Sequence, residues 1–371
     1  MSEISDMIQR LCPDGVEYRK FGDVCFYEQP TKFIVHSINY SDDYETPVLT
    51  AGQSFILGYT NEVDGIYNAS NDNPVIIFDD FTGAFKWVNF PFKVKSSAMK
   101  ILTANSEVLL RYVFHYMGVL NYSSSEHTRL WIGTYSNFEI PVPPLEVQRK
   151  IVEYLDNFSE LTAELTAELE ARKKQYEYYR DNLLNFNRGG QVASDVKWMK
   201  LGEIASINRG IRVTKGDLSE NGFPVFQNCL TPMGYYHEYN CKENTPFIIC
   251  GGAAGNVGYT YEKCWAADDC EYIVGTEEVL NKYMYFFLMS KQDFLKTKVR
   301  KASIPRLSPQ VIKDLLIPIP PLSEQERIVS ILDRFEALTT DLTSGLPAEI
   351  KARQQQYEYY RDQLLTFKRA N

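Results

Sequence analysis

Two short stretches of the sequence concentrate positive charge and could contact the phosphates of a nucleic acid. Residues 291–306 include six basic residues and one acid, and residues 85–100 include four lysines and no acid. Tryptophan, tyrosine and amide side chains are interleaved with them, and these types suit contacts with phosphates and base edges. By itself, such a stretch is more often a solvated face. The candidate nucleic-acid contacts are Lys86, Lys93, Lys95, Lys100, Arg129, Arg209, Arg212, Lys298, Arg300, Lys301 and Arg306.

No pattern in the chain predicts catalysis. The sequence lacks a G-x-x-x-x-G-K-[ST] phosphate loop, an H-E-x-x-H motif, a G-x-S-x-G elbow and the Asn-Pro-Pro-aromatic motif of amino-methyltransferases. The glycine-rich segment 252–258 has G-x-x-G-x-x-G spacing, which favours a hairpin turn over a nucleotide site. The acidic pairs at 79–80 and 268–269 favour turns over a metal-dependent cleavage site, because no third ligand stands at motif spacing. We expect neither catalytic residues nor a metal site.

The composition is that of an ordinary soluble globular protein. The 39 basic and 48 acidic residues give a net charge of −9, so a nucleic-acid-binding surface must be local. At 371 residues, the chain should form two or more domains. The seven cysteines show no disulfide or metal framework, and no segment is typical of a signal peptide or a membrane span. We therefore expect a cytoplasmic protein that does not bind membranes.

An internal repeat divides the chain into two halves of the same plan. The sequence IPVPPL at 140–145 recurs as IPIPPL at 317–322, and QYEYYRD at 175–181 recurs at 356–362. The repeat predicts globular segments at 1–144 and 195–321, each followed by a helical segment, at 145–188 and 322–371. Residues 189–194, which begin with two glycines, are the predicted linker.

Heptad spacing predicts that the two helical segments pair. Seam residues in 145–188 alternate at intervals of four and three over about five repeats. The second segment follows the same rhythm but should break near 345–347, where Gly-Leu-Pro interrupts it. The pair could serve stability alone, or it could present similar surfaces twice, as a pseudo-twofold body would. The predicted seam and interface residues are Leu155, Phe158, Leu165, Leu169, Tyr176, Tyr179, Leu332, Phe335, Leu342, Tyr357 and Tyr360.

The sequence of the globular segments predicts irregular, mostly β domains. Stretches of β-branched and aromatic residues, such as 74–78, 235–239 and 247–250, are broken by clusters of Gly, Asn, Asp and Pro. Apolar residues at helical spacing predict one helix in each half, around 106–120 and 278–291. The fold class is therefore α+β, with two pseudo-symmetric halves that each comprise a mostly β domain and a long helix.

These motifs together resemble the specificity subunit of type I restriction-modification enzymes along the whole chain. The resemblance is carried by the twin IPxPPL and QYEYYRD motifs and by the tandem tetrapeptide TAELTAEL at 162–169. It implies target-recognition domains at 1–144 and 195–321, and conserved spacer helices that pair as an antiparallel coiled coil. In the subgroup that the chain resembles, the copy number of the tetrapeptide sets the gap between two DNA half-sites.

The resemblance also implies a function without catalysis in this chain. A subunit of this kind binds double-stranded DNA, reads a bipartite target and recruits two adenine-N6 methyltransferase subunits and endonuclease/translocase subunits. S-adenosylmethionine, ATP and Mg would then act in the partner subunits. One tetrapeptide adds about 6 Å of helix, which is comparable to one or two base-pair steps. Arg129 and Arg306 stand at the same place in the two halves and are candidates for phosphate contact or domain anchoring.

The sequence leaves two alternative hypotheses open. One is a single-chain S-adenosylmethionine-dependent DNA methyltransferase or restriction enzyme, against which the missing motifs stand. The other is a structural coiled-coil adaptor with no role on DNA, which leaves the basic stretches of the globular halves unexplained.

Overall fold

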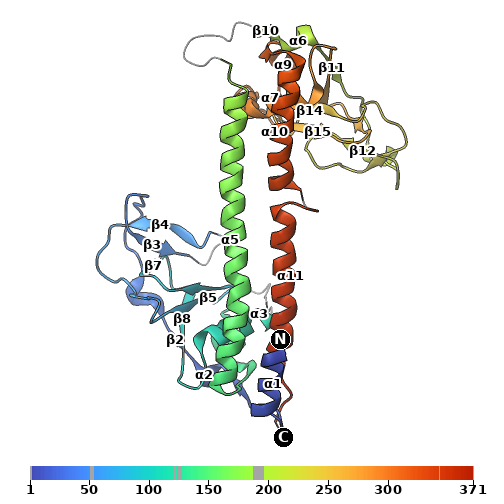
Figure 1. The fold of residues 1–371 in the computed structure, drawn as a ribbon. Helices are drawn as coiled ribbons and strands as arrows, with labels where there is room; N and C mark the ends of the chain where they lie inside the picture. The colour runs from blue at the N-terminus through green and yellow to red at the C-terminus, as the bar shows by residue number, and fades with distance from the viewer. Residues whose placement is uncertain are drawn as a thin grey trace. The chain divides into compact units, whose positions relative to one another are not determined.

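The computed structural model describes residues 2–50, 54–120, 122, 128–186, 196–341 and 343–370 (Figure 1). The chain forms two compact units that do not follow chain order. The first unit combines Met1–Glu164 with Ile350–Asn371, and the second is Leu165–Glu349. The C-terminal helix therefore packs with the N-terminal half of the chain. The predicted linker at 189–194 lies outside the described residues.

The first unit is built on a four-stranded antiparallel sheet of order β2-β8-β5-β6. Its inner strand β5 consists of five residues, all buried, as a run of β-branched and aromatic residues predicts. A three-stranded sheet of order β4-β3-β7 and the pair β1-β9 complete it. The strands are β1 (Tyr18–Lys20), β2 (Cys25–Glu28), β3 (Thr46–Leu49), β4 (Ile56–Thr60), β5 (Val75–Asp79), β6 (Phe85–Val88), β7 (Lys93–Val94), β8 (Met99–Ala104) and β9 (Glu139–Pro141). The shorter helices are α1 (Ser2–Leu11), α2 (Phe21–Val24), η1 (Pro30–Phe33), α3 (Leu110–Leu120), α4 (Leu130–Gly133) and η2 (Tyr135–Asn137).

The second unit repeats this plan, with a four-stranded antiparallel sheet of order β11-β17-β14-β15. A three-stranded sheet β13-β12-β16 and the pair β10-β18 correspond to the smaller sheets of the first unit. The strands are β10 (Lys197–Lys200), β11 (Ala205–Arg209), β12 (Phe223–Phe226), β13 (Tyr235–Tyr236), β14 (Thr245–Ile249), β15 (Val257–Thr260), β16 (Trp265–Ala266), β17 (Cys270–Gly275) and β18 (Leu316–Ile319). The shorter helices are α6 (Leu201–Ile204), η4 (Lys215–Asp217), α7 (Asn281–Ser290), α8 (Gln292–Thr297) and α9 (Pro309–Lys313). Together the two units confirm the predicted α+β fold with repeated halves.

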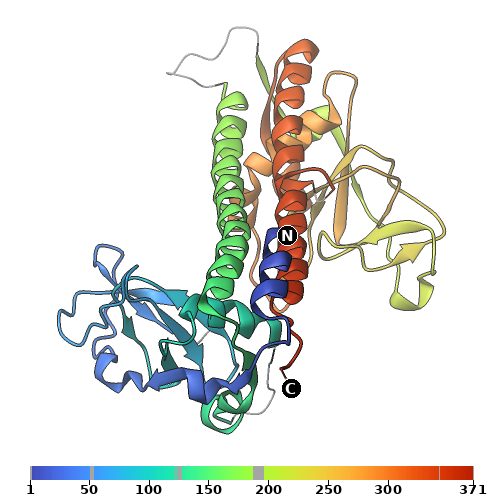
Figure 2. The same ribbon diagram turned by 60° about the horizontal axis from the view of Figure 1, so that its bottom comes forward.

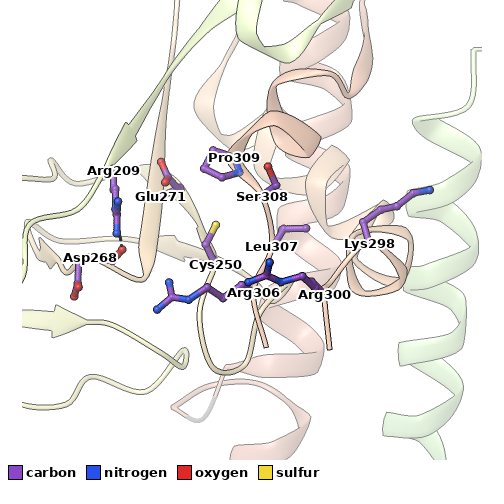
Figure 3. A pocket seen from close by; sticks show the side chains of 10 residues that line it. All are labelled: Arg209, Cys250, Asp268, Glu271, Lys298, Arg300, Arg306, Leu307, Ser308 and Pro309. Atoms are coloured by element: carbon purple, nitrogen blue, oxygen red, sulfur yellow. Dashed lines mark hydrogen bonds between the residues drawn. The ribbon is translucent and has the colours of Figure 1, made fainter. Parts of the chain in front are cut away.

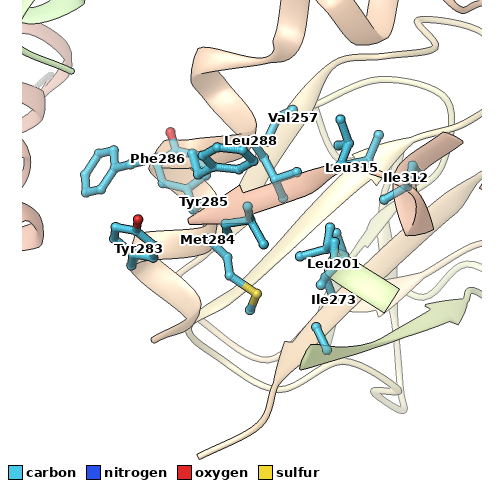
Figure 4. Packing of buried hydrophobic residues seen from close by; sticks show 14 of the residues in the cluster. Leu201, Val257, Ile273, Tyr283, Met284, Tyr285, Phe286, Leu288, Ile312 and Leu315 are labelled. Atoms are coloured by element: carbon cyan, nitrogen blue, oxygen red, sulfur yellow. The ribbon is translucent and has the colours of Figure 1, made fainter. Parts of the chain in front are cut away.

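Local predictions for the globular parts are confirmed as well. Helices α3 and α7 lie within the two predicted helical stretches. The glycine-rich segment joins β14 to β15 as an antiparallel hairpin, with Gly252 and Gly255 at φ +82° and +89°, where glycine is favoured. Figure 4 shows the core of the second unit, in which residues of α7 such as Tyr283 and Phe286 pack with Ile312 and other buried apolar side chains.

Three helices carry the heptad pattern: α5 (Leu145–Leu183), α10 (Leu322–Thr340) and α11 (Leu346–Leu364). Within the first unit, the rings of Tyr154 and Phe158 on α5 pack on Tyr360 of α11, with centroids 5.6 and 5.5 Å apart. Within the second unit, Tyr179 of α5 stacks on Phe335 of α10 at 5.5 Å. The first part of α5 thus pairs with the last helix and its second part with the preceding one, which is the order of an antiparallel pair (Figure 2).

The predicted break in the second helical segment lies between Thr340, where α10 ends, and Leu346, where α11 begins. Asp341 accepts hydrogen bonds from the backbone N–H and the hydroxyl of Thr343, at 2.7 and 2.6 Å. Pro347 stands in the first turn of α11, where its missing N–H costs no helical hydrogen bond. Both helical segments end earlier than predicted, at Leu183 and Leu364.

One buried glutamine ties each long helix to its globular part. The Gln148 amide accepts from the Leu109 N–H at 2.8 Å and donates to two carbonyls, of Glu107 at 3.0 Å and Pro143 at 2.8 Å. At the same place in the repeat, Gln325 makes the same three bonds, each 2.9 Å long, to Leu280, Glu278 and Pro320. The fixed geometry of these bonds explains why glutamine recurs after both proline-rich motifs.

Candidate nucleic-acid interface

Four of the candidate cations in the second unit surround one pocket of about 350 Å³ (Figure 3). Arg209 stands at the end of β11, Lys298 and Arg300 follow α8, and Arg306 precedes α9. Arg300 and Arg306 exchange two backbone hydrogen bonds, of 2.8 and 3.2 Å, which close the segment between them into a tight loop. All four side chains are exposed. Residues far apart in sequence thus form one basic, concave surface.

Two of these arginines are held in place by acidic residues that follow β16. Arg306 Nη1 lies 2.9 Å from Asp269 Oδ1, and Arg209 Nε donates to the Asp268 carbonyl at 3.2 Å. By contrast, neither Arg300 nor Lys298 forms a side-chain hydrogen bond or ion pair with any described residue, and the Lys298 ammonium lies 5.1 Å from the Phe294 ring centroid. The pocket therefore combines fixed guanidinium groups with unconstrained cations. The acidic pair occupies a turn, as predicted.

Acidic groups also line the pocket. Glu271 stands opposite Arg209 in the β11–β17 register and is only 5% exposed. Burial raises the pKa of the Glu271 carboxyl, and the charge of Arg209 partly offsets this effect. The buried Oδ1 atom of Asp268 has no hydrogen-bond partner among the described residues. Burial also raises the pKa of the neighbouring Cys250 thiol to about 12, which makes it a poor nucleophile.

At the corresponding place, the first unit has a closed ion cluster. Asp80 Oδ2 lies 3.2 Å from Arg129 Nη1 and 3.4 Å from Lys100 Nζ, and Asp80 Oδ1 accepts from the Trp131 N–H at 2.8 Å. The side chains of Lys100 and Asp80 are 4% and 1% exposed. Lys100 Nζ also donates to Gln29. The carboxylate of Asp80 is thus a structural counter-ion, and Arg129 remains half exposed.

Two of the predicted contacts must be corrected. Lys93 is 2% exposed at its side chain, and its Nζ lies 2.7 Å from Glu62 Oε2 and donates to the Asp64 carbonyl at 2.6 Å. The hydrogen-bonded ion pair with Lys93 lowers the pKa of the Glu62 carboxyl to about 2. Lys100 is buried against Asp80 as described. A buried, paired ammonium group cannot reach a phosphate, so neither lysine belongs to the candidate interface.

The remaining cations of the candidate set are exposed but do not line the pocket. Lys86 lies on β6, and Lys95 Nζ is 3.3 Å from the Tyr40 hydroxyl. In the second unit, Arg212 and Lys301 are exposed, and neither forms a side-chain ion pair with a described residue. Within the described part of the chain, no group of three or more His, Cys, Asp or Glu side chains could hold a metal ion.

Both halves of the chain match one family model, described as the type I restriction modification DNA specificity domain, at residues 13–172 and 193–352. The chain belongs to this family of type I restriction-modification specificity subunits. It is 40% identical to the Escherichia coli type I restriction enzyme EcoR124I/EcoR124II specificity subunit over 407 aligned positions, which cover 99% of this chain and 98% of that protein. The resemblance seen in the sequence is therefore confirmed.

Solved structures share the fold of this specificity subunit. The S subunit of a type I restriction-modification system from M. genitalium matches with a TM-score of 0.66 at 16% identity, covering 95% of this chain and 96% of that one. A chain from a structural study of complex assembly in the type I R-M system matches with a TM-score of 0.57 at 17% identity, covering 95% and 98%. Among the described helices of this chain, none is both long and apolar enough to cross a membrane.

Most predicted seam residues of the specificity subunit are buried or partly buried. Leu155 and Leu332 are fully buried, whereas Tyr179 is 40% exposed. Phe158, Leu165, Leu169, Tyr176, Phe335, Tyr357 and Tyr360 are partly buried, and Leu342 lies outside the described residues. The exposed members of the twin QYEYYRD motifs are instead Tyr178 and Tyr359, at 66% and 59%. A heptad pattern identifies the seam but not these outward-facing rings.

Sequence reasoning also missed a cation that clamps each recognition domain to its helix. Arg111 of α3 lies 2.7 Å from Asp156 of α5, with its guanidinium 4.7 Å from the Trp87 ring centroid. In the second unit, Lys282 of α7 lies 3.4 Å from Asp333 and 2.7 Å from Glu336 of α10. Its ammonium group lies 4.4 Å from the Tyr259 ring centroid. The only sequence signal is that the two aspartates match in the repeat.

Proposed function

We propose that this chain is the non-catalytic, sequence-specific DNA-binding subunit of a type I restriction-modification complex. It reads a bipartite target, with one half-site for each recognition domain. The observation that carries the proposal is the pocket of the second unit, which exposed Arg209, Lys298, Arg300 and Arg306 line in a chain of net negative charge. A local basic surface of this kind is what binding to the phosphate backbone requires.

The loop from Lys298 to Arg306 supplies contacts to the DNA backbone. Lys298, Arg300 and Lys301 are exposed, and none forms an ion pair with a described residue, so their charges are available to phosphates. Flexible side chains of this type position a protein on DNA without reading sequence. In the first recognition domain, the exposed Lys86, Lys95 and Arg129 take the corresponding role.

Helix α5 sets the spacing between the half-sites. The tandem tetrapeptide at 162–169 lies inside this uninterrupted helix of 39 residues. The division between the two compact units falls after Glu164, within the tetrapeptides. A change in helix length at this point therefore changes the length of chain that joins the two recognition domains, by about 6 Å for each tetrapeptide.

Two copies of an adenine-N6 methyltransferase subunit bind the repeated helical segments, and endonuclease/translocase subunits complete the complex. The internal repeat supports this stoichiometry, because exposed Tyr178 and Tyr359 offer the same motif twice. S-adenosylmethionine, ATP and Mg act in those partners, and the complex acts on DNA in the cytoplasm.

A map of modified bases in the host genome, with and without this gene, tests the proposal. We expect a split motif with N6-methyladenine, made of two unrelated half-sites, to disappear when the gene is deleted. A contiguous or palindromic motif, or an unchanged methylome in cells that express the methyltransferase partner, would refute the proposal. Methyl transfer to DNA by the purified chain alone would instead support a single-chain methyltransferase.

A further inference from the structure

The repeat allows residues of the two recognition domains to be paired by their place in the sheet. The Leu130 N–H donates to the Asp80 carbonyl at 2.8 Å, and the Leu307 N–H donates to the Cys250 carbonyl at 2.9 Å. Asp80 and Cys250 directly follow β5 and β14, which hold the same place in the two sheets, and are therefore equivalent. In the register of the next strand, β8 or β17, Lys100 and Glu271 occupy the same place and are equivalent. Opposite them, directly after edge strand β2 and at the end of edge strand β11, Gln29 and Arg209 are equivalent in the same way.

One feature around these positions is the same in both domains. Arg129 and Arg306 are equivalent, and each bonds an aspartate, Asp80 at 3.2 Å and Asp269 at 2.9 Å. Their side chains are also equally exposed, at 49% and 47%. A contact that both domains share cannot make their half-sites differ, so these arginines suit a common role such as phosphate contact.

The three other positions differ in both charge and shape. In the first domain, Gln29 and Lys100 fill the site: Lys100 Nζ donates to the Gln29 carbonyl oxygen, and the Gln29 amide donates to the Ser97 carbonyl at 3.2 Å. In the second domain, Arg209, Glu271 and Cys250 leave an open pocket instead. The same sheet therefore presents a closed, satisfied surface in one domain and an open site with donors and acceptors in the other.

Arg209 has the geometry of a base reader rather than of a simple phosphate contact. Its Nε–H is committed to the Asp268 carbonyl at 3.2 Å, and buried Glu271 stands opposite on β17. The side chain is otherwise exposed at the pocket, and its terminal amino groups bond no described residue (Figure 3). A guanidinium fixed at one edge, with two terminal N–H groups available, matches the O6 and N7 acceptors of guanine.

We infer that Arg209 determines specificity in the second recognition domain by donating two hydrogen bonds to a guanine of its half-site. The inference rests on the proposed function and adds the residue and the base that it reads. Lys298, Arg300 and Lys301 act beside it on the DNA backbone. Gln29, the equivalent of Arg209 in the first domain, has its amide committed within the protein, so the first half-site is read by other residues.

Substitution of Arg209 in the assembled complex tests the inference. The complex with its methyltransferase partners is prepared with wild-type chain, Arg209→Ala and Arg209→Lys, and the methylated sequences are selected from a random DNA library. We expect a single G·C pair, in one half-site only, to lose about 5- to 150-fold of its preference in Arg209→Ala, since one bidentate contact supplies that discrimination. The other half-site and the spacer should be unchanged. Arg209→Lys keeps the charge, so its binding should keep the wild-type salt dependence.

Lys298→Ala is the matched comparison in the same pocket. We expect it to weaken binding to every sequence alike and to make the negative slope of log K against log salt shallower by about 1. The selected target sequences should not change. If Arg209→Ala behaves like Lys298→Ala, or if the position that relaxes is an A·T pair, the inference is wrong. If the wild-type complex itself selects no split motif, the proposed function fails, which is a separate result from unchanged words in the Arg209 variants.

Discussion

Deletion of one tetrapeptide, residues 166–169, tests whether α5 measures the distance between half-sites. The deletion removes four residues from the interior of a 39-residue helix. With a rise of 1.5 Å and a turn of 100° per residue, the helix shortens by about 6 Å, and the part beyond the deletion turns by about 40° past one full turn. Because B-DNA rises about 3.4 Å and turns about 35° per base pair, both changes correspond to between one and two base pairs.

The rest of the chain can accommodate this change. The chain crosses from one compact unit to the other inside α5 and returns between Glu349 and Ile350. Because α10 ends at Thr340 and α11 is a separate helix that begins at Leu346, the return path does not impose a fixed helical length. Both recognition domains, and the glutamines that tie them to the helices, lie outside the deleted residues.

The assay is modified-base sequencing of cells that carry the complex with the wild-type chain, the deletion, or an insertion of a third tetrapeptide. We expect the spacer to become one or two base pairs shorter in the deletion and longer by the same amount in the insertion, with both half-site words intact. Replacing residues 166–169 by another helix-forming tetrapeptide is the control of equal length and should leave the spacer unchanged. An unchanged spacer length in the deletion variant, or a changed half-site sequence, would refute the role of α5.

Three further predictions concern stability and the limits of the DNA surface. Gln148→Leu removes the partner of one N–H and two carbonyls and should lower the free energy of unfolding by about 3 kcal/mol or more in urea titrations. The exposed control Gln354→Leu should change it by less than about 0.5 kcal/mol, and equal effects of the two variants would contradict the tie seen at Gln148. Burial lowers the pKa of His115 despite its bond to Asp156, so folding favours the neutral ring. The folding free energy that depends on this neutral ring is therefore present above the ordinary pKa of 6.5 and is lost as the pH falls below it. His115→Asn should flatten this part of the stability–pH curve. Lys100→Met should leave the salt slope of DNA binding unchanged while destabilising the first unit around Asp80, and a slope that falls by about 1 would mean that Lys100 does reach a phosphate.

The elements that the sequence predicted well are those whose signal spans many residues. The heptad rhythm of α5, the proline at 347 and the twin motifs each fix a structure through local geometry, so they could be read without knowing what packs against them. The same is true of the glycine-rich hairpin between β14 and β15.

The candidate interface was predictable only in part, because a run of basic residues does not say which side chains face inward. Lys93 and Lys100 are neutralised by Glu62 and Asp80, which are distant in sequence and carry no pairing signal. Arg209 is the opposite case, because it lies outside both basic stretches and yet lines the pocket. The pairing of β11 with β17 brings it there. Likewise, the packing of α11 with the first unit depends on contacts such as that of His115 with Tyr357, which no repeat reveals.

The distribution of twin and unmatched residues separates two tasks in this specificity subunit. Gln148 and Gln325 are equivalent, as are the cations of α3 and α7 that clamp each domain to a helical aspartate. These contacts fix domain to helix, and they lie on α3, α7 and the long helices. The unmatched residue Arg209 lies on β11, on the opposite edge of the sheet from the clamp partner on β15. Because the two sets occupy different elements, the pocket can change its charge and shape, and with them the base that we propose it reads, without disturbing the attachment of the domain to its helix.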